Sequence, residues 1–116
     1  MKKTVSLKSN EQVLISKLEI AEGFFSRAKG LLGTKGLSAE QGLWIYHCNS
    51  IHTFFMKYAI DCIFVNKNMV VKKIYVNVKP WRMTWPAWGS DSVIEVASGE
   101  VSKWNLKVGD QLYVGN

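Results

Sequence analysis

Alternation of apolar and polar residues predicts a chain made mainly of short β-strands. In Val13–Ala21, Leu18 and Ile20 alternate with Lys17 and Glu19, which is the two-residue period of a strand with one buried face. The alternation changes phase after residue 15, so a β-bulge is expected there. Further strands are expected at residues 42–47, 62–65, 70–77, 93–96 and 111–114. Residues 66–68, Asn-Lys-Asn, predict a hairpin turn in which an asparagine takes a positive φ.

One segment has the period of a helix instead. Its apolar residues recur at intervals of three and four and form a single face: Phe24, Phe25, Ala28, Leu31 and Leu32. Gly33 is a natural C-terminal stop, so one prominent helix is expected over about residues 22–33. Short strands with one helix predict a mostly β, α+β fold, either a compact antiparallel β-sandwich or a barrel-like sheet.

The length of 116 residues predicts a single domain over residues 1–116, with residues 1–11 as a flexible or edge segment. A chain of this length buries about 65% of its unfolded surface, so it needs neither a metal nor a disulfide for stability. Its 47% hydrophobic and 21% charged residues exclude a disordered protein.

The net charge is +6, from 15 Lys and Arg against 9 Asp and Glu. No run of five cations occurs, so the sequence disfavours nucleic acid as a partner and predicts only weak, salt-sensitive binding. The first ten residues contain no apolar core of a signal peptide, and no apolar run approaches the ~18 residues of a membrane helix. We therefore expect a cytoplasmic protein without membrane contact, in which Cys48 and Cys62 stay free thiols.

Residues 47–56 fit neither a strand nor a helix, and they hold both histidines and one cysteine. This segment also carries a resemblance to a known family. The matching strings run in order along the chain: Arg-Ala-Lys-Gly-Leu-Leu-Gly at 27–33, Cys-Asn-Ser-Ile-His-Thr-Phe-Phe-Met at 48–56, Ile-Asp at 60–61, Pro-Trp-Arg at 80–82, Val-Ile-Glu at 93–95 and Val-Gly-Asp at 108–110. Over about residues 12–115 the chain resembles the domain of unknown function 192 family. The resemblance implies a small β-rich fold with one prominent helix, and it implies no activity.

The residue types in this segment are those of two kinds of reactive site, a thiol nucleophile and a zinc site. Cys48 as nucleophile, His52 as base and Asp61 as the group that orients the imidazole would make a small hydrolase-like enzyme. The alternative, which we favour, is that Cys48 is a small buried apolar residue and His52 a structural one. His47, Cys48, His52 and Cys62 could ligate zinc, but their spacing matches no closed tetrahedral site, so no metal and no cofactor are expected.

The leading hypothesis is a binding or accessory module with a polar site around residues 50–56. Its expected ligand-binding residues come from separate parts of the chain: Arg27, Ser50, His52, Thr53, Asp61 and Arg82. Such a group can hold an anionic or hydroxyl-rich small molecule, although the same residues could instead form an internal salt-bridge network. In either case Asp61 is expected to contact His52, Arg27, Arg82 or the backbone N–H groups of residues 50–56, because a lone buried carboxylate is prohibitive.

A second candidate is the tryptophan-rich segment 81–89. Trp81, Trp85 and Trp88 could form a recognition loop for a small molecule, a peptide or a protein, or the contact of a structural partner in an assembly. The alternative is that Trp81 packs into the core while Trp85 and Trp88 cover a sheet edge.

Overall fold

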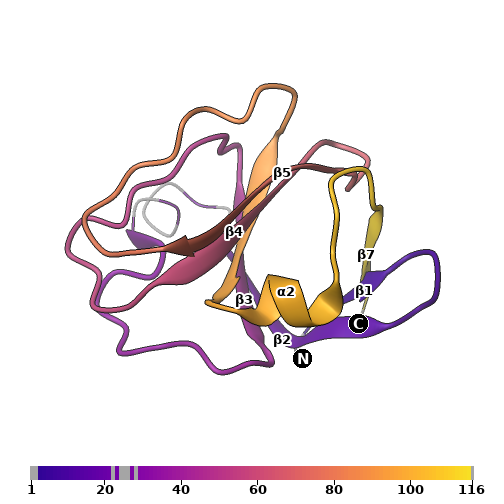
Figure 1. The fold of residues 1–116 in the computed structure, drawn as a ribbon, viewed down its shortest axis with the longest axis horizontal. Helices are drawn as coiled ribbons and strands as arrows, with labels where there is room; N and C mark the ends of the chain where they lie inside the picture. The colour runs from indigo at the N-terminus through magenta and orange to yellow at the C-terminus, as the bar shows by residue number, and fades with distance from the viewer. Residues whose placement is uncertain (1–2, 22, 24–26, 28, 116) are drawn as a thin grey trace.

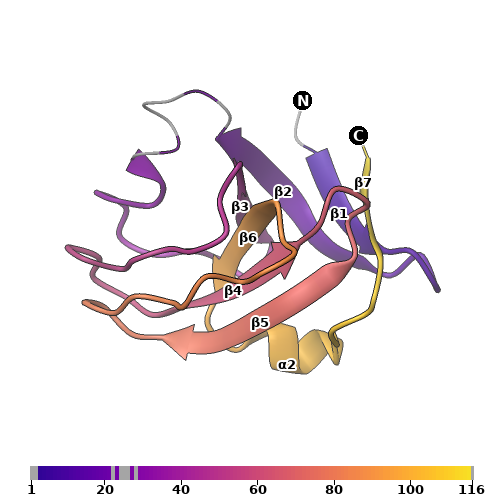
Figure 2. The ribbon, with the colours of Figure 1, turned by 90° about the horizontal axis from the view of Figure 1, so that it is seen from above.

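The computed structural model describes residues 3–21, 23, 27 and 29–115, and within them one seven-stranded sheet and one short helix. The elements in chain order are β1 (Lys3–Leu7), β2 (Val13–Ala21), β3 (Gln41–Tyr46), β4 (Ile60–Val65), β5 (Val71–Val78), β6 (Ser92–Ala97), α2 (Glu100–Trp104) and β7 (Leu112–Gly115). The strands follow the order β5-β4-β6-β3-β2-β1-β7, and the sheet curls into a half-barrel (Figures 1 and 2).

The curl brings the two outer strands of the sheet toward each other. An isolated bridge joins Val70, before β5, to Gln111, before β7. Two backbone hydrogen bonds in the same region join Val71 to residues 109 and 110. All neighbouring strands are antiparallel except β2 and β3, which are parallel. The predicted mostly β, barrel-like α+β fold is therefore confirmed.

The six strands predicted from alternation are all present, with ends within about two residues of the predicted ones. The predicted bulge is confirmed by register shifts between β1 and β2 on both sides of the pair Val5–Ile15. The N-terminal segment differs from the predicted flexible or edge segment. Its strand β1 pairs with both β2 and β7 and is therefore not at an edge of the sheet. The hairpin at residues 66–68 is confirmed by the antiparallel pairing of β4 with β5, although the positive φ (63°) falls on Met69 and the Asn66 side chain accepts the turn's hydrogen bonds.

The sheet buries both of its faces. In β6, Ile94 and Val96 face one core, which also holds Val101 of α2. Val93 faces a second core, together with Cys62 and Phe64 of β4. Because side chains alternate along a strand, Glu95 falls on the same face as Val93 and is cross-strand neighbour to Cys62. A carboxylate therefore stands among the residues of the second core.

The predicted helix over residues 22–33 lies partly on residues 22, 24–26 and 28, which are outside the described part of the chain. Arg27 and Lys29 have helical backbone, and residues 30–33 form turns. The short helix α2 is not foreseen by the sequence pattern. It packs on the concave side of the curled sheet (Figure 1), and Gly99, with φ of 95°, begins it.

Candidate functional site

A cavity of about 170 Å³ gathers several of the polar residues singled out from the sequence. Its polar wall is formed by Arg27, Cys48, Ser50, His52 and Glu95, with Lys29 beside them. The remaining wall is apolar and consists of Gly30, Leu31, Leu32, Ile45, Ile51 and Met56. We call this space the Glu95 cavity. It lies on the second-core face of the sheet, between β3, β6 and the segments that follow β2 and β3.

Glu95 is the most unusual member of this wall. Glu95 is only 4% exposed, and its cross-strand neighbours are Leu43 of β3 and Cys62 of β4. No hydrogen bond or ion pair joins its carboxylate to another residue of the described part of the chain, and its oxygens are not among the sealed atoms there that lack a partner, so they keep access to the cavity. Burial alone raises the pKa of Glu95 from 4.5 to about 7. Near neutral pH the side chain is therefore poised between its acidic and ionised forms.

Arg27 lies on the cavity wall as well, and it is also incompletely paired. Its Nε atom is buried and has no hydrogen-bond partner among the described residues. Arg27 makes no ion pair with Glu95, although the charges of both side chains act on the thiol of Cys48. A cation and an acid thus share one wall of the cavity without forming an ion pair with each other.

Cys48 has the character of a protonated thiol. Burial is the largest effect and raises its pKa, and the charge of Glu95 raises it further, while the Ser50 backbone and Arg27 act in the opposite direction. Its Sγ donates to the carbonyl of Ser50 at 2.9 Å. His52, nearby on the wall, is exposed, and its Nδ1 accepts a hydrogen bond from the Phe54 N–H at 3.3 Å. Both cysteines are free, as predicted.

Asp61 does not belong to this site, which corrects the predicted contact. The carboxylate is fully buried on the opposite face of β4 from Cys62, in the region of the first core and α2. Its Oδ1 accepts from the Asn77 N–H at 2.8 Å, and its Oδ2 accepts from the N–H groups of Gly99 and Val101 at 3.0 and 3.2 Å. None of its partners is an arginine, a histidine or the 50–56 loop, because the two-residue period of β4 turns Asp61 away from them. The predicted group of Cys48, His52 and Asp61 is therefore not assembled.

The side chains of two further predicted ligand residues form hydrogen bonds with the backbone of residues 79–82. Thr53 is fully buried, and its hydroxyl donates to the Lys79 carbonyl at 2.6 Å and accepts from the Arg82 N–H at 2.9 Å. The guanidinium of Arg82 is exposed and donates to the carbonyl of Trp81 at 3.4 Å. Of the six predicted ligand residues, the structure brings together Arg27, Ser50 and His52. It places Thr53, Asp61 and Arg82 outside the cavity.

The tryptophans of segment 81–89 are all exposed. Trp81 is 55% exposed, Trp85 82% and Trp88 81%, so Trp81 is not a core residue. Trp81 stacks on Phe54 with ring centroids 5.9 Å apart and lies 4.7 Å from the ring of Phe55. The alternative in which Trp81 fills the core is therefore wrong, and an exposed aromatic loop remains.

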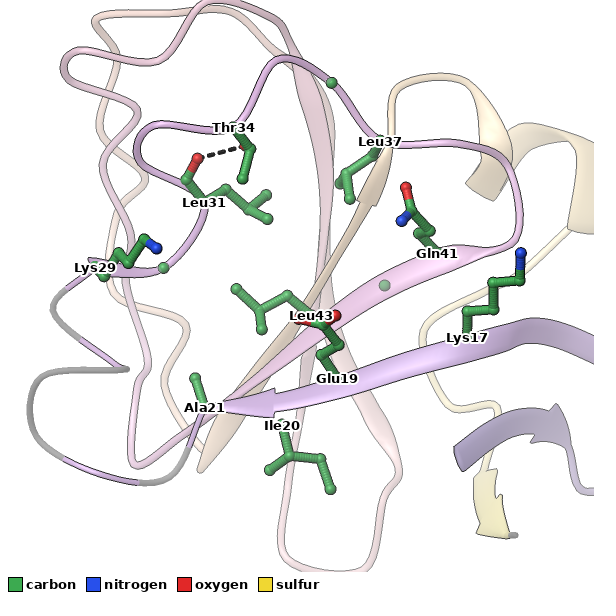
Figure 3. A pocket seen from close by; sticks show the side chains of 13 residues that line it. Lys17, Glu19, Ile20, Ala21, Lys29, Leu31, Thr34, Leu37, Gln41 and Leu43 are labelled. Carbon is green, nitrogen blue, oxygen red and sulfur yellow. Dashed lines mark hydrogen bonds between the residues drawn. The ribbon is translucent and has the colours of Figure 1, made fainter. Parts of the chain in front are cut away.

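A larger cavity, of about 320 Å³, lies between β2, β3 and residues 29–37 (Figure 3). Several of its polar side chains already have partners within the protein. Lys17 pairs with Glu40 at 3.5 Å, and the Thr34 hydroxyl donates to the Leu31 carbonyl at 2.5 Å. The Gln41 side chain accepts a backbone N–H at 2.8 Å. This cavity holds no unpaired buried group among the residues described, so size alone does not make it the better candidate.

Within the described ranges, no three His, Cys, Asp or Glu side chains are grouped so as to hold a metal ion. No helix there is both long and apolar enough to cross a membrane. Sequence reasoning missed two polar residues of the wall, Lys29 and Glu95. A signal for Glu95 exists in the sequence, since this residue interrupts the apolar strand Ser-Val-Ile-Glu-Val-Ala at an inward position.

Comparisons with known proteins agree with the fold. A UPF0127 protein of Thermococcus sibiricus is 31% identical over 113 residues, covering 90% of this chain and 70% of that protein. A solved protein of unknown function from Novosphingobium aromaticivorans is 27% identical, with a TM-score of 0.80 over 96% of this chain and 82% of that one. A Sinorhizobium meliloti protein, described as a candidate transcription regulator, has a TM-score of 0.83 over 97% of this chain and 91% of that one. At 17% identity it shows the fold alone.

The family model named DUF192, described as "Uncharacterized ACR", matches residues 5–114, which run from β1 to β7. That span includes every wall of the Glu95 cavity. The chain therefore belongs to the DUF192 family, whose curated members carry the name UPF0127.

Proposed function

We propose that this protein is a binding module that holds a small molecule in the Glu95 cavity. The observation that carries the proposal is the state of Glu95, which is nearly buried and has no partner within the described chain. A lone buried carboxylate costs stability unless something pairs with it. Perturbed titratable groups in a concave, mostly apolar pocket are typical of binding sites. A ligand that donates a hydrogen bond to Glu95 would relieve that cost.

Arg27 indicates which chemical group the other end of the ligand carries. Arg27 lines the cavity, and its guanidinium carries a permanent positive charge and several N–H donors. The ligand we propose therefore has a donor, neutral or cationic, at one end and an acceptor, neutral or anionic, at the other. The cavity of about 170 Å³ is smaller than the roughly 300–1,000 Å³ of drug-sized pockets. Molecules of the size of urea or a small amino acid fit this description.

Binding is a better-supported function than hydrolysis by Cys48. Thiolate character is what makes a cysteine nucleophilic, and both burial and the Glu95 charge raise the pKa of Cys48. The carboxylate expected to orient His52 is bound by three backbone N–H groups elsewhere. We therefore assign Cys48 a role in the shape of the wall and in donating to the Ser50 carbonyl.

The test is a set of small probes with one or two functional ends. Glycine, β-alanine, γ-aminobutyrate and urea carry both a donor and an acceptor, whereas methylammonium and acetate carry only one. Each is titrated to high millimolar concentration into ¹⁵N-labelled protein at pH 8, where Glu95 is ionised. At least one two-ended probe is expected to shift the amides of residues 48–52 and 93–96 with a millimolar Kd, as suits so few atoms, and more strongly than either one-ended probe.

The matched variants are Glu95→Gln and Glu40→Gln, the latter removing an exposed carboxylate that pairs with Lys17. The zwitterionic probes should lose their effect in Glu95→Gln and keep it in Glu40→Gln. The proposal is wrong if no two-ended probe moves the cavity amides, or if Glu95→Gln binds the zwitterions as wild type does.

A further inference from the structure

We infer that the exposed rings of segments 52–55 and 81–88 form a surface on which single-stranded nucleic acid stacks. This surface, here called the aromatic surface, consists of His52, Phe54, Phe55 and Trp81, with Trp85 and Trp88 further along the same loop. It is distinct from the Glu95 cavity except for His52, which lines both.

The rings of this surface are arranged as a series. His52 stacks on Phe54 with centroids 4.9 Å apart and planes 28° apart. Phe54 stacks on Trp81 at 5.9 Å and 29°. Phe55 meets Trp81 at 4.7 Å with the planes tilted by 59°. Phe55 is 72% exposed and Trp81 55%, so ring area is left for a further planar partner.

The backbone fixes these rings in place although they lie on loops. His52 forms a bridge with Met83, and Thr53 exchanges backbone hydrogen bonds with Trp81 and Arg82 at 2.8–3.0 Å. Phe55 and Trp81 both have left-handed φ values, of 68° and 66°. Non-glycine residues rarely adopt such values, and they persist when the surroundings impose them. The ring positions are therefore set before any partner arrives, which lowers the entropy lost on binding.

The sequence that carries the aromatic surface is rich in cations. Residues 51–90 contain six cations and one carboxylate, and that carboxylate is the fully buried Asp61. All six cations are exposed: Lys57, Lys67, Lys72, Lys73, Lys79 and Arg82. Lys57, Lys79 and Arg82 each lie within two residues of a ring of the aromatic surface, so single cations stand beside the rings although the sequence has no cationic run.

One lysine of β5 contacts the tryptophan loop, and a second lies over a tyrosine that is hydrogen-bonded to it. The Lys72 side chain lies against Gly89, where a Cβ would be 3.5 Å from its Cε. Lys73 lies over the ring of Tyr75 with Nζ 5.3 Å from the centroid, and the Tyr75 hydroxyl donates to the Trp85 carbonyl at 3.4 Å. The edge strand β5 therefore supplies positive charge beside Trp85 and Trp88.

Stacked exposed rings together with positive charge favour a single-stranded polyanion with planar bases. Proteins that bind single strands without sequence preference combine a cationic track with aromatic rings on which bases stack. A duplex keeps its base faces covered and offers only phosphates. A protein partner would use the rings but would gain less from the exposed cations beside them. The proposed binding is sequence-tolerant, micromolar at low salt, and weaker as salt rises.

The test is fluorescence anisotropy of a labelled thymidine 15-mer, with a duplex of equal length and poly-glutamate as competitors. Trp81→Ala and Trp85→Ala remove surface rings, and Tyr113→Ala is the matched control, an aromatic 60% exposed on β7. Each tryptophan variant should bind the 15-mer about fivefold or more weakly, while Tyr113→Ala binds as wild type. Arg82→Gln should reduce the salt dependence, and Lys107→Gln, distant in sequence and exposed, should not.

The inference is overturned if the 15-mer does not bind at low salt, or if both tryptophan variants bind it as wild type does. It is equally overturned if poly-glutamate competes as well as unlabelled 15-mer, since charge alone would then explain binding and an acidic protein would be the better partner. Circular dichroism of each variant confirms that the fold is intact.

Discussion

Replacing Glu95 by glutamine tests the electrostatic basis of the candidate site through stability alone. The substitution keeps the shape of the side chain but removes its ability to ionise. In the folded protein, burial raises the pKa of Glu95 from 4.5 to about 7. Each pKa unit corresponds to about 1.4 kcal/mol, so the fully ionised form costs the fold about 3 kcal/mol relative to the protonated form.

The direction of the pH dependence follows from proton binding. Between pH 4.5 and about 7 the folded protein retains a proton on Glu95 that the unfolded chain has released. The free energy of unfolding therefore falls as pH rises through that window, and this contribution levels off above about 7. Glu95→Gln has no such contribution. The variant should match wild type near pH 4.5 and exceed its stability by up to about 3 kcal/mol at pH 8.

Urea denaturation followed by tryptophan fluorescence at pH 5, 6, 7 and 8 measures this difference. Glu40→Gln is the control, because it removes an exposed carboxylate and should leave the pH profile of wild type almost unchanged. If wild type and Glu95→Gln lose stability in parallel from pH 5 to pH 8, then Glu95 is not a desolvated, unpaired acid. The physical basis of the proposed site would then be lost as well.

Three further outcomes are expected. Cys48 should react slowly with iodoacetamide at pH 7 because burial raises its pKa, and Glu95→Gln should speed the reaction by removing a nearby negative charge; an unchanged rate would contradict the placement of Glu95 beside the thiol. Asp61→Asn should lower the free energy of unfolding by about 2–4 kcal/mol, because the amide keeps one accepting oxygen and its NH₂ group cannot accept the N–H bonds made to the other, either that of Asn77 or those of Gly99 and Val101; wild-type urea stability would refute this. Thr53→Val should cost about 1–3 kcal/mol by orphaning its loop partners, with faster amide exchange at Arg82 as the specific readout.

The strands could be predicted because alternation in this chain is strong and local. The helix α2 could not, because it has only five residues and no side chain of its own that caps it. Its first N–H groups are satisfied by Asp61, which lies 38 to 40 residues earlier in the chain. The strand β1 was missed for a similar reason, since its partners are β2 and the distant β7. Both elements depend on contacts that no local pattern encodes.

The candidate site was predictable in part. Arg27, Ser50 and His52 converge as the sequence suggested, because the segments after β2 and β3 fold over the same face of the sheet. Asp61 was assigned to that face wrongly, since the direction of a side chain depends on strand register, and register was not known. Glu95 belongs to the Val-Ile-Glu string that resembles the family. Its parity with Val93 in an apolar strand was enough to place it inward.

Asp61 and Glu95 together show how a buried carboxylate that supports a fold differs from one that supports a site. The two residues lie on adjacent strands, β4 and β6, one register position apart and on opposite faces of the sheet. Asp61 accepts three backbone N–H bonds and so fastens α2 to the sheet. Glu95 is nearly as buried, yet its surroundings raise its pKa to about 7 and supply no donor within the described chain. A fold gains nothing from an acid in that state, since an apolar residue there would be more stable. The missing donor is therefore best sought outside the chain, in whatever occupies the cavity in front of Glu95.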